Sequence, residues 1–182
     1  MARYLDRVTK QWYEPATDTG DCGAGYIRNP DLSGVVGVPQ SRWVIDGDTV
    51  RAPTSEENAA FDAAELEAAK INKVAAIDER TKDLLENGSV TVNGEEVSTS
   101  LAAQVTLNGL KGLYDIGLLT FPQEISATNG LSYTVNSIND FKRVVGLVGT
   151  YVMTTKAAGR VLRAAVIAAT STAQVESVED NR

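Results

Sequence analysis

The side chain best able to act as a nucleophile in this chain is its single cysteine. Cys22 lies in the glycine-rich stretch TGDCGAGYI, which could present an exposed thiol. The chain contains no histidine, so the usual base that activates such a thiol is missing, and activation would need a nearby cation. We therefore interpret Cys22 as a structural or incidental thiol.

Paired acidic residues are the second candidates, because two carboxylates can bind calcium or share acid and base roles. The pairs are Asp18 with Asp21, Asp46 with Asp48, and Glu95 with Glu96. None has the spacing of a calcium loop, and aspartates are common in turns. The absence of histidine excludes His-based triads, the common zinc sites and facial iron triads. The sequence predicts no catalytic residue, no metal site and no cofactor.

Phosphate binding is not indicated either. Gly20, Gly23 and Gly25 lack the lysine and the following helix of a phosphate-binding loop, so they are interpreted as turn glycines. With 17 basic and 24 acidic residues the net charge is −7, which repels nucleic acid. Five basic residues spread around one predicted helix and suit salt bridges or solvent: Lys142, Arg143, Lys156, Arg160 and Arg163.

Targeting signals are also missing from the sequence. The start, MARYLDRVTKQWYEP, has no apolar core of signal-peptide length. The most apolar later run, Val144 to Met153, is bounded by Arg143 and Lys156 and is too short to span a bilayer. We expect neither secretion nor membrane insertion.

A long helix is predicted from Thr54, where the sequence becomes rich in alanine, glutamate and lysine and contains no glycine or proline. Thr54 and Glu57 have the spacing of a capping box, and Asn87-Gly88 indicates a helix end with a left-handed glycine. The helix has a thin apolar stripe with Phe61, Leu66 and Ile77 to its sides. The stripe consists of Ala60, Ala64, Ile71, Val74 and Leu85.

A second long helix is predicted from Ser137, which can cap it with Asp140, to about Ala173. Apolar residues repeat at steps of four and three, which is the seam spacing of packed helices. The predicted core residues of this seam are Phe141, Val145, Val148, Val152, Leu162 and Val166. A second stripe makes the helix apolar on more than one side, so we expect it to be central; it comprises Val144, Leu147, Tyr151, Ala158, Val161 and Ala165.

Short hairpins and a third helix are predicted between the two long helices. In SVTVNGEEVS, Asn93 and Gly94 can both adopt positive φ, as a type I′ turn requires. Ser98, Thr99 or Ser100 can then cap a helix from Leu101 to about Ile116. LLTFPQEI and LSYTVN flank residues 127–130 and predict another ribbon.

Residues 1 to 53 hold four of the five prolines and many glycines, which predicts an extended arm with short strands. Its aromatic residues are candidate anchors on a neighbouring subunit, because they bury much area for few rotors: Tyr4, Trp12, Tyr13, Tyr26 and Trp43. They could instead fold back on the C-terminal body. A further alternative to the neighbouring subunit is a local β core in which residues 43–45 and 49–50 pair across the turn at 46–48. Both interpretations can hold together.

The predicted fold class is therefore α+β, mainly α. We expect a helical bundle of two long helices and a shorter one with short β-hairpins over residues 54–182. The extended Pro/Gly-rich arm of residues 1–53 precedes this body. The long seam favours a homo-oligomer, although the sequence does not select its symmetry.

Several stretches resemble one family. IDERTKDLL, the glycine and hairpin after it, SLAAQVTLNGL, SINDFKRVVG and the ending AVIAATSTAQVESVEDNR are similar to a domain of unassigned function in small proteins of tailed bacteriophages. Such proteins are often encoded near tail-fibre and baseplate proteins. The block YIRNPDLSGVVGVPQSRW is also phage-like, so the resemblance extends from about Tyr26 to the end.

The resemblance implies a location rather than a reaction. It implies a virion structural protein of the tail fibre, baseplate or fibre attachment, present in the host cytoplasm during assembly and bound to other virion proteins. Capsid decoration, a head-to-tail connector and a tail-assembly chaperone are the alternatives. No nucleic acid, membrane or cofactor is expected as a partner, and no enzymatic activity is predicted.

Overall fold

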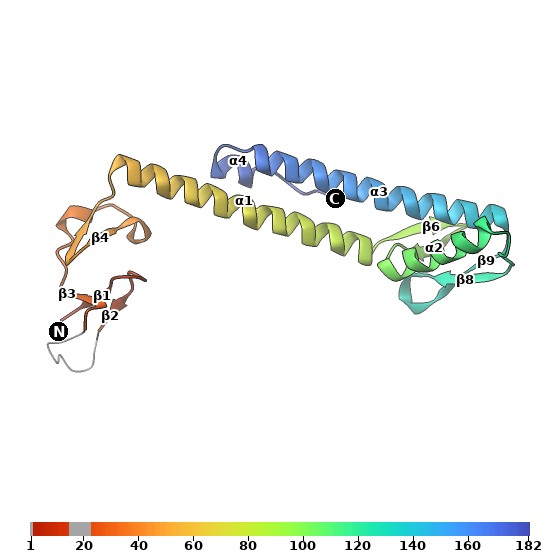
Figure 1. The fold of residues 1–182 in the computed structure, drawn as a ribbon, viewed down its shortest axis with the longest axis horizontal. Helices are drawn as coiled ribbons and strands as arrows, with labels where there is room; N and C mark the ends of the chain where they lie inside the picture. The colour runs from red at the N-terminus through yellow and green to blue at the C-terminus, as the bar shows by residue number, and fades with distance from the viewer. Residues whose placement is uncertain (1, 15–22) are drawn as a thin grey trace. The chain divides into compact units, whose positions relative to one another are not determined.

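The computed structural model describes residues 2–14 and 23–182, and its fold is α+β with helix predominating (Figure 1). The chain divides into two compact units, Met1–Glu65 and Leu66–Arg182, which we call unit 1 and unit 2. The boundary between them lies inside the first long helix, α1 (Ser55–Glu86). The mainly helical α+β class predicted from the sequence is confirmed.

Unit 1 is built from short strands and turns. Strand β1 (Tyr4–Asp6) lies between β2 (Trp12–Tyr13) and β3 (Tyr26–Arg28) in an antiparallel sheet. A hairpin of β4 (Val44–Asp46) and β5 (Thr49–Arg51) follows two 3-10 turns, η1 (Ser33–Val35) and η2 (Gln40–Arg42). Gly47 has a φ of 58° in the turn between β4 and β5, where a side chain would be strained.

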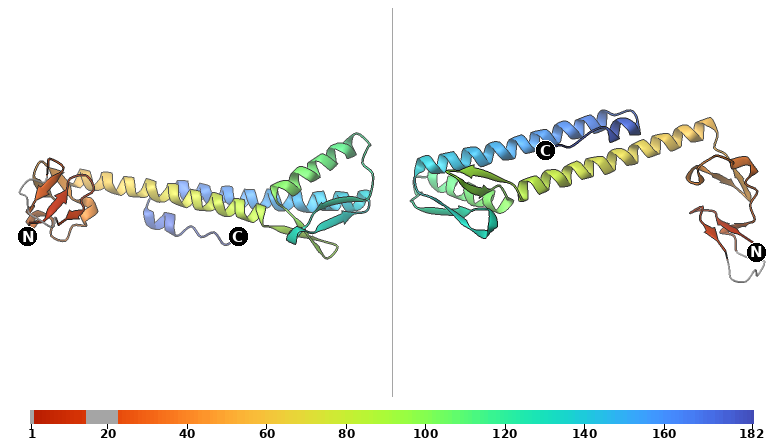
Figure 2. Two further views of the ribbon diagram at one scale, coloured as in Figure 1. Left: turned by 90° about the horizontal axis from the view of Figure 1, so that it is seen from below. Right: turned by 180° about the vertical axis from the view of Figure 1, so that it is seen from behind.

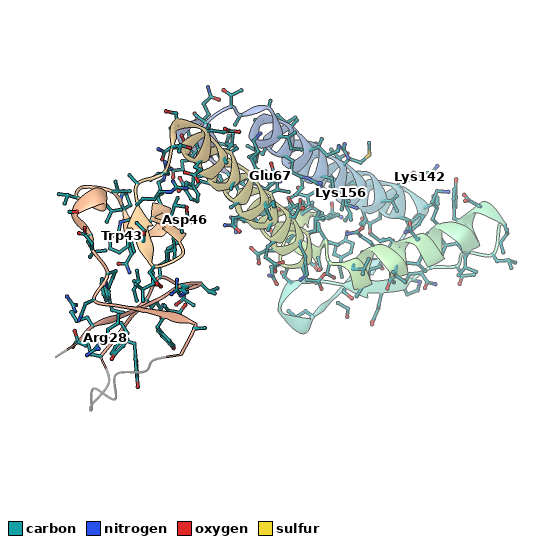
Figure 3. All side chains as sticks on the ribbon, turned by 60° about the vertical axis from the view of Figure 1, so that its left-hand side comes forward. Arg28, Trp43, Asp46, Glu67, Lys142 and Lys156 are labelled. Carbon is teal, nitrogen blue, oxygen red and sulfur yellow. The ribbon has the colours of Figure 1, made fainter. Side chains whose placement is uncertain are left out.

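Part of unit 1 forms a small hydrophobic core, which corrects the prediction of an extended arm. The buried residues of this core are Leu5, Ile27, Val35, Trp43 and Val50. The Trp43 indole lies among the strands and donates its N–H to the Val38 carbonyl at 2.9 Å (Figure 3). The local β core around residues 43–50, one of the two alternatives, is therefore present.

The burial of two predicted anchors corrects their assignment as partner-binding residues. Tyr4 and Trp43 are buried inside unit 1 and cannot offer their rings to another subunit. Trp12 is half-buried against the core, with the Arg3 guanidinium 4.8 Å from the centre of its ring. Tyr13 is 54% exposed and its ring lies 6.0 Å from that of Tyr26. A partner-binding role for Trp12, Tyr13 and Tyr26 stays a prediction.

The predicted capping box at the start of α1 is confirmed. The Thr54 N–H donates to the Glu57 carboxylate at 2.7 Å, and the Glu57 N–H donates to the Thr54 hydroxyl at 3.2 Å. The same carboxylate accepts two hydrogen bonds from Arg51, at 2.7 and 2.8 Å. The Arg51 guanidinium and then the Thr54 N–H lower the pKa of Glu57 from 4.5 to about 2.

This pKa predicts how the helix start responds to acid. The pKa of Glu57 is lower in the folded than in the unfolded state. The ionised Glu57 carboxylate therefore stabilises the folded chain fully above about pH 4.5, and this stabilisation is lost as the pH falls through about 2. A carboxyl NMR titration should place the midpoint of Glu57 at about 2. The Glu57→Gln variant should lose this pH dependence. A midpoint at 4.5 would contradict the observed hydrogen bonding.

The second half of α1 packs antiparallel to α3 (Ile138–Ala168), and the two run side by side in both views of Figure 2. The Tyr151 hydroxyl donates to the Leu84 carbonyl at 3.0 Å, and Lys70 donates to the Ile167 carbonyl at 3.0 Å. Their common apolar cluster contains Ile77, Val166, Ala169 and Val175, with Leu66, Val74 and Leu162 beside it.

The predicted stripe of α1 is wrong in part. Ala60, Ala64 and Ile71 are exposed, whereas Ile77, which the sequence placed to the side, is the buried residue of the helix. The large apolar residues of α1 are few and irregularly spaced, so they do not all lie on one side of the helix. Packing against α3 and the C-terminal segment selects Ile77.

Along α3 the predicted seam is the buried face, while the second stripe is wrong for half of its residues; Tyr151 and Ala158 of that stripe are half-buried. Phe141, Val148 and Val166 are buried, and Val145, Val152 and Leu162 are half-buried against the clusters. In the second stripe, Val144 is buried. Leu147, Val161 and Ala165 are exposed, because α1 and the hairpins cover only one side of α3.

The end of α3 also differs from the prediction, which extended it to Ala173. The helix ends at Ala168 and Ala169 adopts an extended conformation. Ser171 caps a separate short helix, α4 (Thr172–Glu176), by accepting from the Gln174 N–H at 3.3 Å, and this new cap competes with continuing the old helix. The chain then returns along the helices, and Arg182 donates to the Thr155 carbonyl and the Thr81 hydroxyl.

The segment that connects α1 to α3 in the sequence forms a lobe of two hairpins and one short helix. Strands β6 (Ser89–Val92) and β7 (Glu95–Ser98) pair antiparallel, as do β8 (Gln123–Ser126) and β9 (Ser132–Val135). Helix α2 (Leu101–Asp115) begins at Ser100, whose hydroxyl accepts from the Ala103 N–H. The predicted hairpins and the predicted cap are confirmed.

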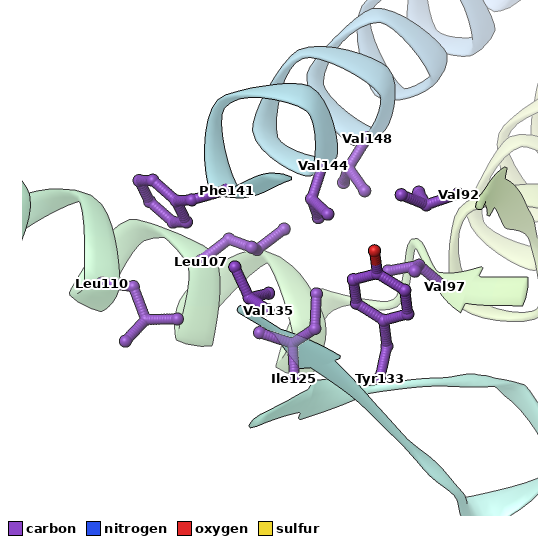
Figure 4. Close-up of a cluster of buried hydrophobic side chains, with 10 residues drawn as sticks. All are labelled: Val92, Val97, Leu107, Leu110, Ile125, Tyr133, Val135, Phe141, Val144 and Val148. Carbon is purple, nitrogen blue, oxygen red and sulfur yellow. The ribbon is translucent and has the colours of Figure 1, made fainter. Parts of the chain in front are cut away.

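The core of this lobe joins α2, the hairpins and the start of α3 (Figure 4). The side chains of Leu107, Val135 and Val144 point toward one another from α2, β9 and α3. Asn93 and Gly94 have φ values of 54° and 88°, as predicted for the turn between β6 and β7.

The glycine after α1 has a different role from the predicted one. Gly88 is not among the residues with positive φ, so it is not a left-handed helix cap. A Cβ at this position would lie 2.2 Å from the Leu84 carbonyl oxygen and 2.5 Å from the Tyr151 hydroxyl. The close approach of α1, α3 and Thr99 requires glycine here.

Candidate interaction surface

The residues singled out as candidates for chemistry do not gather into a metal site in the described part of the chain. Residues 2–14 and 23–182 contain no group of three or more acidic, cysteine or histidine side chains able to hold a metal ion. Asp48 is bound by Arg7 in the turn between β4 and β5. Glu96 accepts hydrogen bonds from Ser89 and Thr91, and these hydroxyls lower its pKa.

Several sequence-derived candidates lie outside the described residues: Asp18, Gly20, Asp21 and Cys22. The basic residues of α3 are described, and three of the five have partners. Arg163 pairs with Asp78 at 3.3 Å, Arg143 donates to the Asn93 amide oxygen at 2.7 Å, and Lys142 lies 5.7 Å from the centre of the Tyr114 ring. These contacts fit the predicted salt-bridging and surface role.

A polar network fastens the turn between β6 and β7 to the start of α3. The Tyr133 hydroxyl donates to Asp140 at 2.7 Å and accepts from the Asn93 amide at 2.9 Å. Burial, followed by the Asp140 carboxylate, raises the pKa of Tyr133. The Asp140 N–H donates to the hydroxyl of Ser137, the N-cap residue of α3, at 3.2 Å. The network therefore links β9, the turn between β6 and β7, and the start of α3.

The exposed apolar side chains of unit 2 are concentrated on and just after α2. Among the described residues of both units, fifteen large hydrophobic side chains are exposed, and six of them lie between residues 101 and 118. They are Leu101, Val105, Leu113, Tyr114, Ile116 and Leu118. Scattered exposed hydrophobic residues are ordinary, but a concentration on one element indicates an interaction surface.

Helical geometry places most of these residues on one side of α2. At 100° per residue, the buried residues Ala103, Leu107 and Leu110 form one face, and the opposite face is continuous and exposed. We call this opposite side the α2 outer face. It consists of Leu101, Ala102, Val105, Asn108, Gly109, Gly112, Leu113 and, just after the helix end, Ile116. Figure 2 shows α2 diverging from α3 at the edge of unit 2.

The α2 outer face carries no charge. The only charged side chains of the helix are Lys111 and Asp115, which bind each other at 2.5 Å on its flank. A helix whose outer side faces only water normally carries polar or charged residues there. An uncharged outer side is what a helix covered by another protein surface would show.

Two glycines in the middle of α2 strengthen this interpretation. A Cβ added at Gly109 or Gly112 would meet no atom within 4 Å, so nothing in the described chain requires glycine at either position. Glycine in a helix interior costs about 0.5–1 kcal/mol relative to alanine. Gly146 and Gly149 of α3 are equally open, so the glycines of α2 indicate a partner only because exposed apolar side chains lie beside them on the same face.

A shallow groove lies between α2 and α3 and is a lesser candidate. It has a volume of about 210 Å³, and Leu107, Asn108, Val148 and Gly149 are among its lining residues. Met153 lines one end and is 72% exposed. No charged side chain lines this groove, so it extends the uncharged surface beside α2.

The residue pattern alone indicated the aromatic residues of unit 1 and the seam of α3, and not the α2 outer face. A signal for it was present. Residues 102, 105, 109, 112 and 116 follow steps of three and four, the same spacing used to predict the seam of α3. Because two of these positions are glycine, the pattern does not stand out by hydrophobicity alone.

No family model matches this chain, and no curated protein or solved structure matches it. Among the described residues, no helix combines the length and hydropathy needed to span a bilayer.

Proposed function

We propose that this chain is a structural component of a tailed-bacteriophage virion, in the tail fibre, baseplate or fibre attachment. It works by binding other protein surfaces and not by catalysis. The observation that carries the binding role is the uncharged, exposed α2 outer face with its two unexplained glycines. The virion location rests on the resemblance of the sequence to small phage proteins.

Other features support a binding role over an enzymatic one. One member of each acidic pair in the described residues is engaged: Asp48 pairs with Arg7, and Glu96 accepts hydrogen bonds from Ser89 and Thr91. Tyr13 and Val36 are exposed on unit 1 and are further contact points for a virion partner. The net charge of −7 disfavours nucleic acid as that partner.

Mass spectrometry of gradient-purified particles tests the proposal. A structural component is expected in fixed stoichiometry, and copy numbers in multiples of three, six or twelve would support the tail. Hundreds of copies would favour capsid decoration instead. A tail-assembly chaperone would be abundant in infected cells and absent from the particles, which would overturn the proposal.

A cell-wall hydrolase is the enzymatic rival. A zymogram of the purified chain is expected to show no clearing. Clearing that is lost on replacement of a single acidic residue would overturn the structural role.

A further inference from the structure

We infer that the α2 outer face is the contact surface for a second copy of this chain, with the two α2 helices packed antiparallel about a two-fold axis. The inference deepens the proposed function by naming one partner of the chain. It rests on that function only for the premise that the chain works by binding protein surfaces.

The order of large and small residues on this face is self-complementary. Val105, Gly109, Gly112 and Ile116 follow steps of four, three and four, which read the same in both directions. In an antiparallel pair centred between residues 110 and 111, Val105 therefore meets Ile116 of the partner subunit. Gly109 meets Gly112 of the partner subunit in the same arrangement. A two-fold interface requires such reciprocal contacts.

The central glycines explain how the helices would approach. Interaxial distance depends on the side chains at the contact, and glycine gives the least separation. Neither Gly109 nor Gly112 has an atom within 4 Å of its missing Cβ, so the space is open in the single chain. Val105 and Ile116 are 63% and 66% exposed and lie on either side of this space. Each Val105 would contact Ile116 of the partner subunit, which gives two apolar contacts. These lie on either side of the point where the two helices cross at their glycines.

Charge does not oppose an identical partner on this surface. Each copy carries a net charge of −7, so two copies repel each other wherever their acidic surfaces meet. The α2 outer face has no charged residue, and its flank carries one lysine already paired with one aspartate, Lys111 with Asp115. Identical copies can therefore meet here without opposing like charges.

The length of the α2 contact sets the expected strength of dimerisation. From Val105 to Ile116 it spans about 16 Å of helix, which is short for a protein interface. We expect association in the micromolar range, which many copies in one particle would reinforce.

Sedimentation of the full chain over about a hundredfold range of concentration tests the inference. The wild-type chain is expected to pass from monomer to dimer. Gly112→Leu should weaken dimerisation at least about tenfold by filling the crossing, while the monomer stays folded because leucine favours helix more than glycine. Gly146→Leu in α3 is the matched control, since Gly146 also has no atom within 4 Å, and it should leave the dimer unchanged.

A charge pair tests the register. Val105→Lys should disrupt the dimer by placing a charge against Ile116 of the partner subunit. The double variant Val105→Lys with Ile116→Glu should restore it, because the new lysine would face the new glutamate across the two-fold axis. Within one chain these positions are eleven residues apart in the helix and cannot pair with each other.

Three results would overturn the inference: a wild-type chain that stays monomeric, a dimer insensitive to Gly112→Leu, or a double variant no more dimeric than Val105→Lys alone. The virion proposal would survive each of them, since particle composition is measured separately. Conversely, a chain absent from particles could still dimerise through α2.

Discussion

Replacing Gly88 by alanine should lower the free energy of unfolding by about 3 kcal/mol, one of the largest effects available to a single methyl group in this chain. The new Cβ would lie 2.2 Å from the Leu84 carbonyl oxygen, 2.5 Å from the Tyr151 hydroxyl and 2.8 Å from the Thr99 hydroxyl. The closest of these atoms is backbone at the end of α1, so it cannot move without disturbing the helix.

The contacts around Gly88 explain why relief is difficult. The Tyr151 hydroxyl is fixed by its bond to the Leu84 carbonyl, and the Thr99 N–H donates to the Gly88 carbonyl at 3.0 Å. Moving any one of these groups breaks a hydrogen bond between α1, α3 and the hairpin.

Denaturant unfolding of Gly88→Ala measures this effect, with Gly146→Ala as the control. A Cβ at Gly146 meets nothing within 4 Å and lies inside a helix, so that variant should be more stable than wild type by about 0.5–1 kcal/mol. Equal behaviour of the two variants would show that Gly88 is not held by close packing.

The second large effect is expected at Ile77. Ile77→Ala should cost about 2–5 kcal/mol, because the side chain is 2% exposed and its removal leaves a cavity beside Val166 and Val175. These residues come from α1, α3 and α4, so the loss weakens the packing that holds three segments of unit 2 together.

Ile71→Ala is the matched control on the same helix. Ile71 is 60% exposed, and its truncation should change the free energy of unfolding by about 0.5 kcal/mol or less. The two variants also compare the apolar stripe expected from sequence, which included Ile71, with the face that the fold buries. A greater loss at Ile71 than at Ile77 would contradict the packing of α1 on α3.

Much of the local structure could be predicted because its causes are local. The capping box at Thr54, the caps at Ser137 and Ser100 and the turn at Asn93-Gly94 each depend on hydrogen bonds or backbone angles within a few residues. Helix bounds followed from these signals. The main exception is the end of α3, where Ser171 starts a new cap inside an apolar repeat that continues past it.

The candidate surface was less predictable than the helix that bears it. Both faces of α2 are uncharged apart from the flanking pair of Lys111 and Asp115, so the pattern alone does not distinguish the covered side from the open one. The buried positions of Ala103, Leu107 and Leu110 decide this, and they depend on where β8, β9 and α3 lie.

By itself, then, the sequence determined where most helices and turns begin, because the hydrogen bonds that define these starts close between near neighbours. Only the tertiary structure decided which apolar residues are buried. It placed Ile77 inside and Ile71 outside, gave residues 1–53 a core around Trp43, and made Gly88 a point of close approach. These outcomes depend on contacts between segments far apart in the chain, and each helix offers more than one apolar face for such contacts.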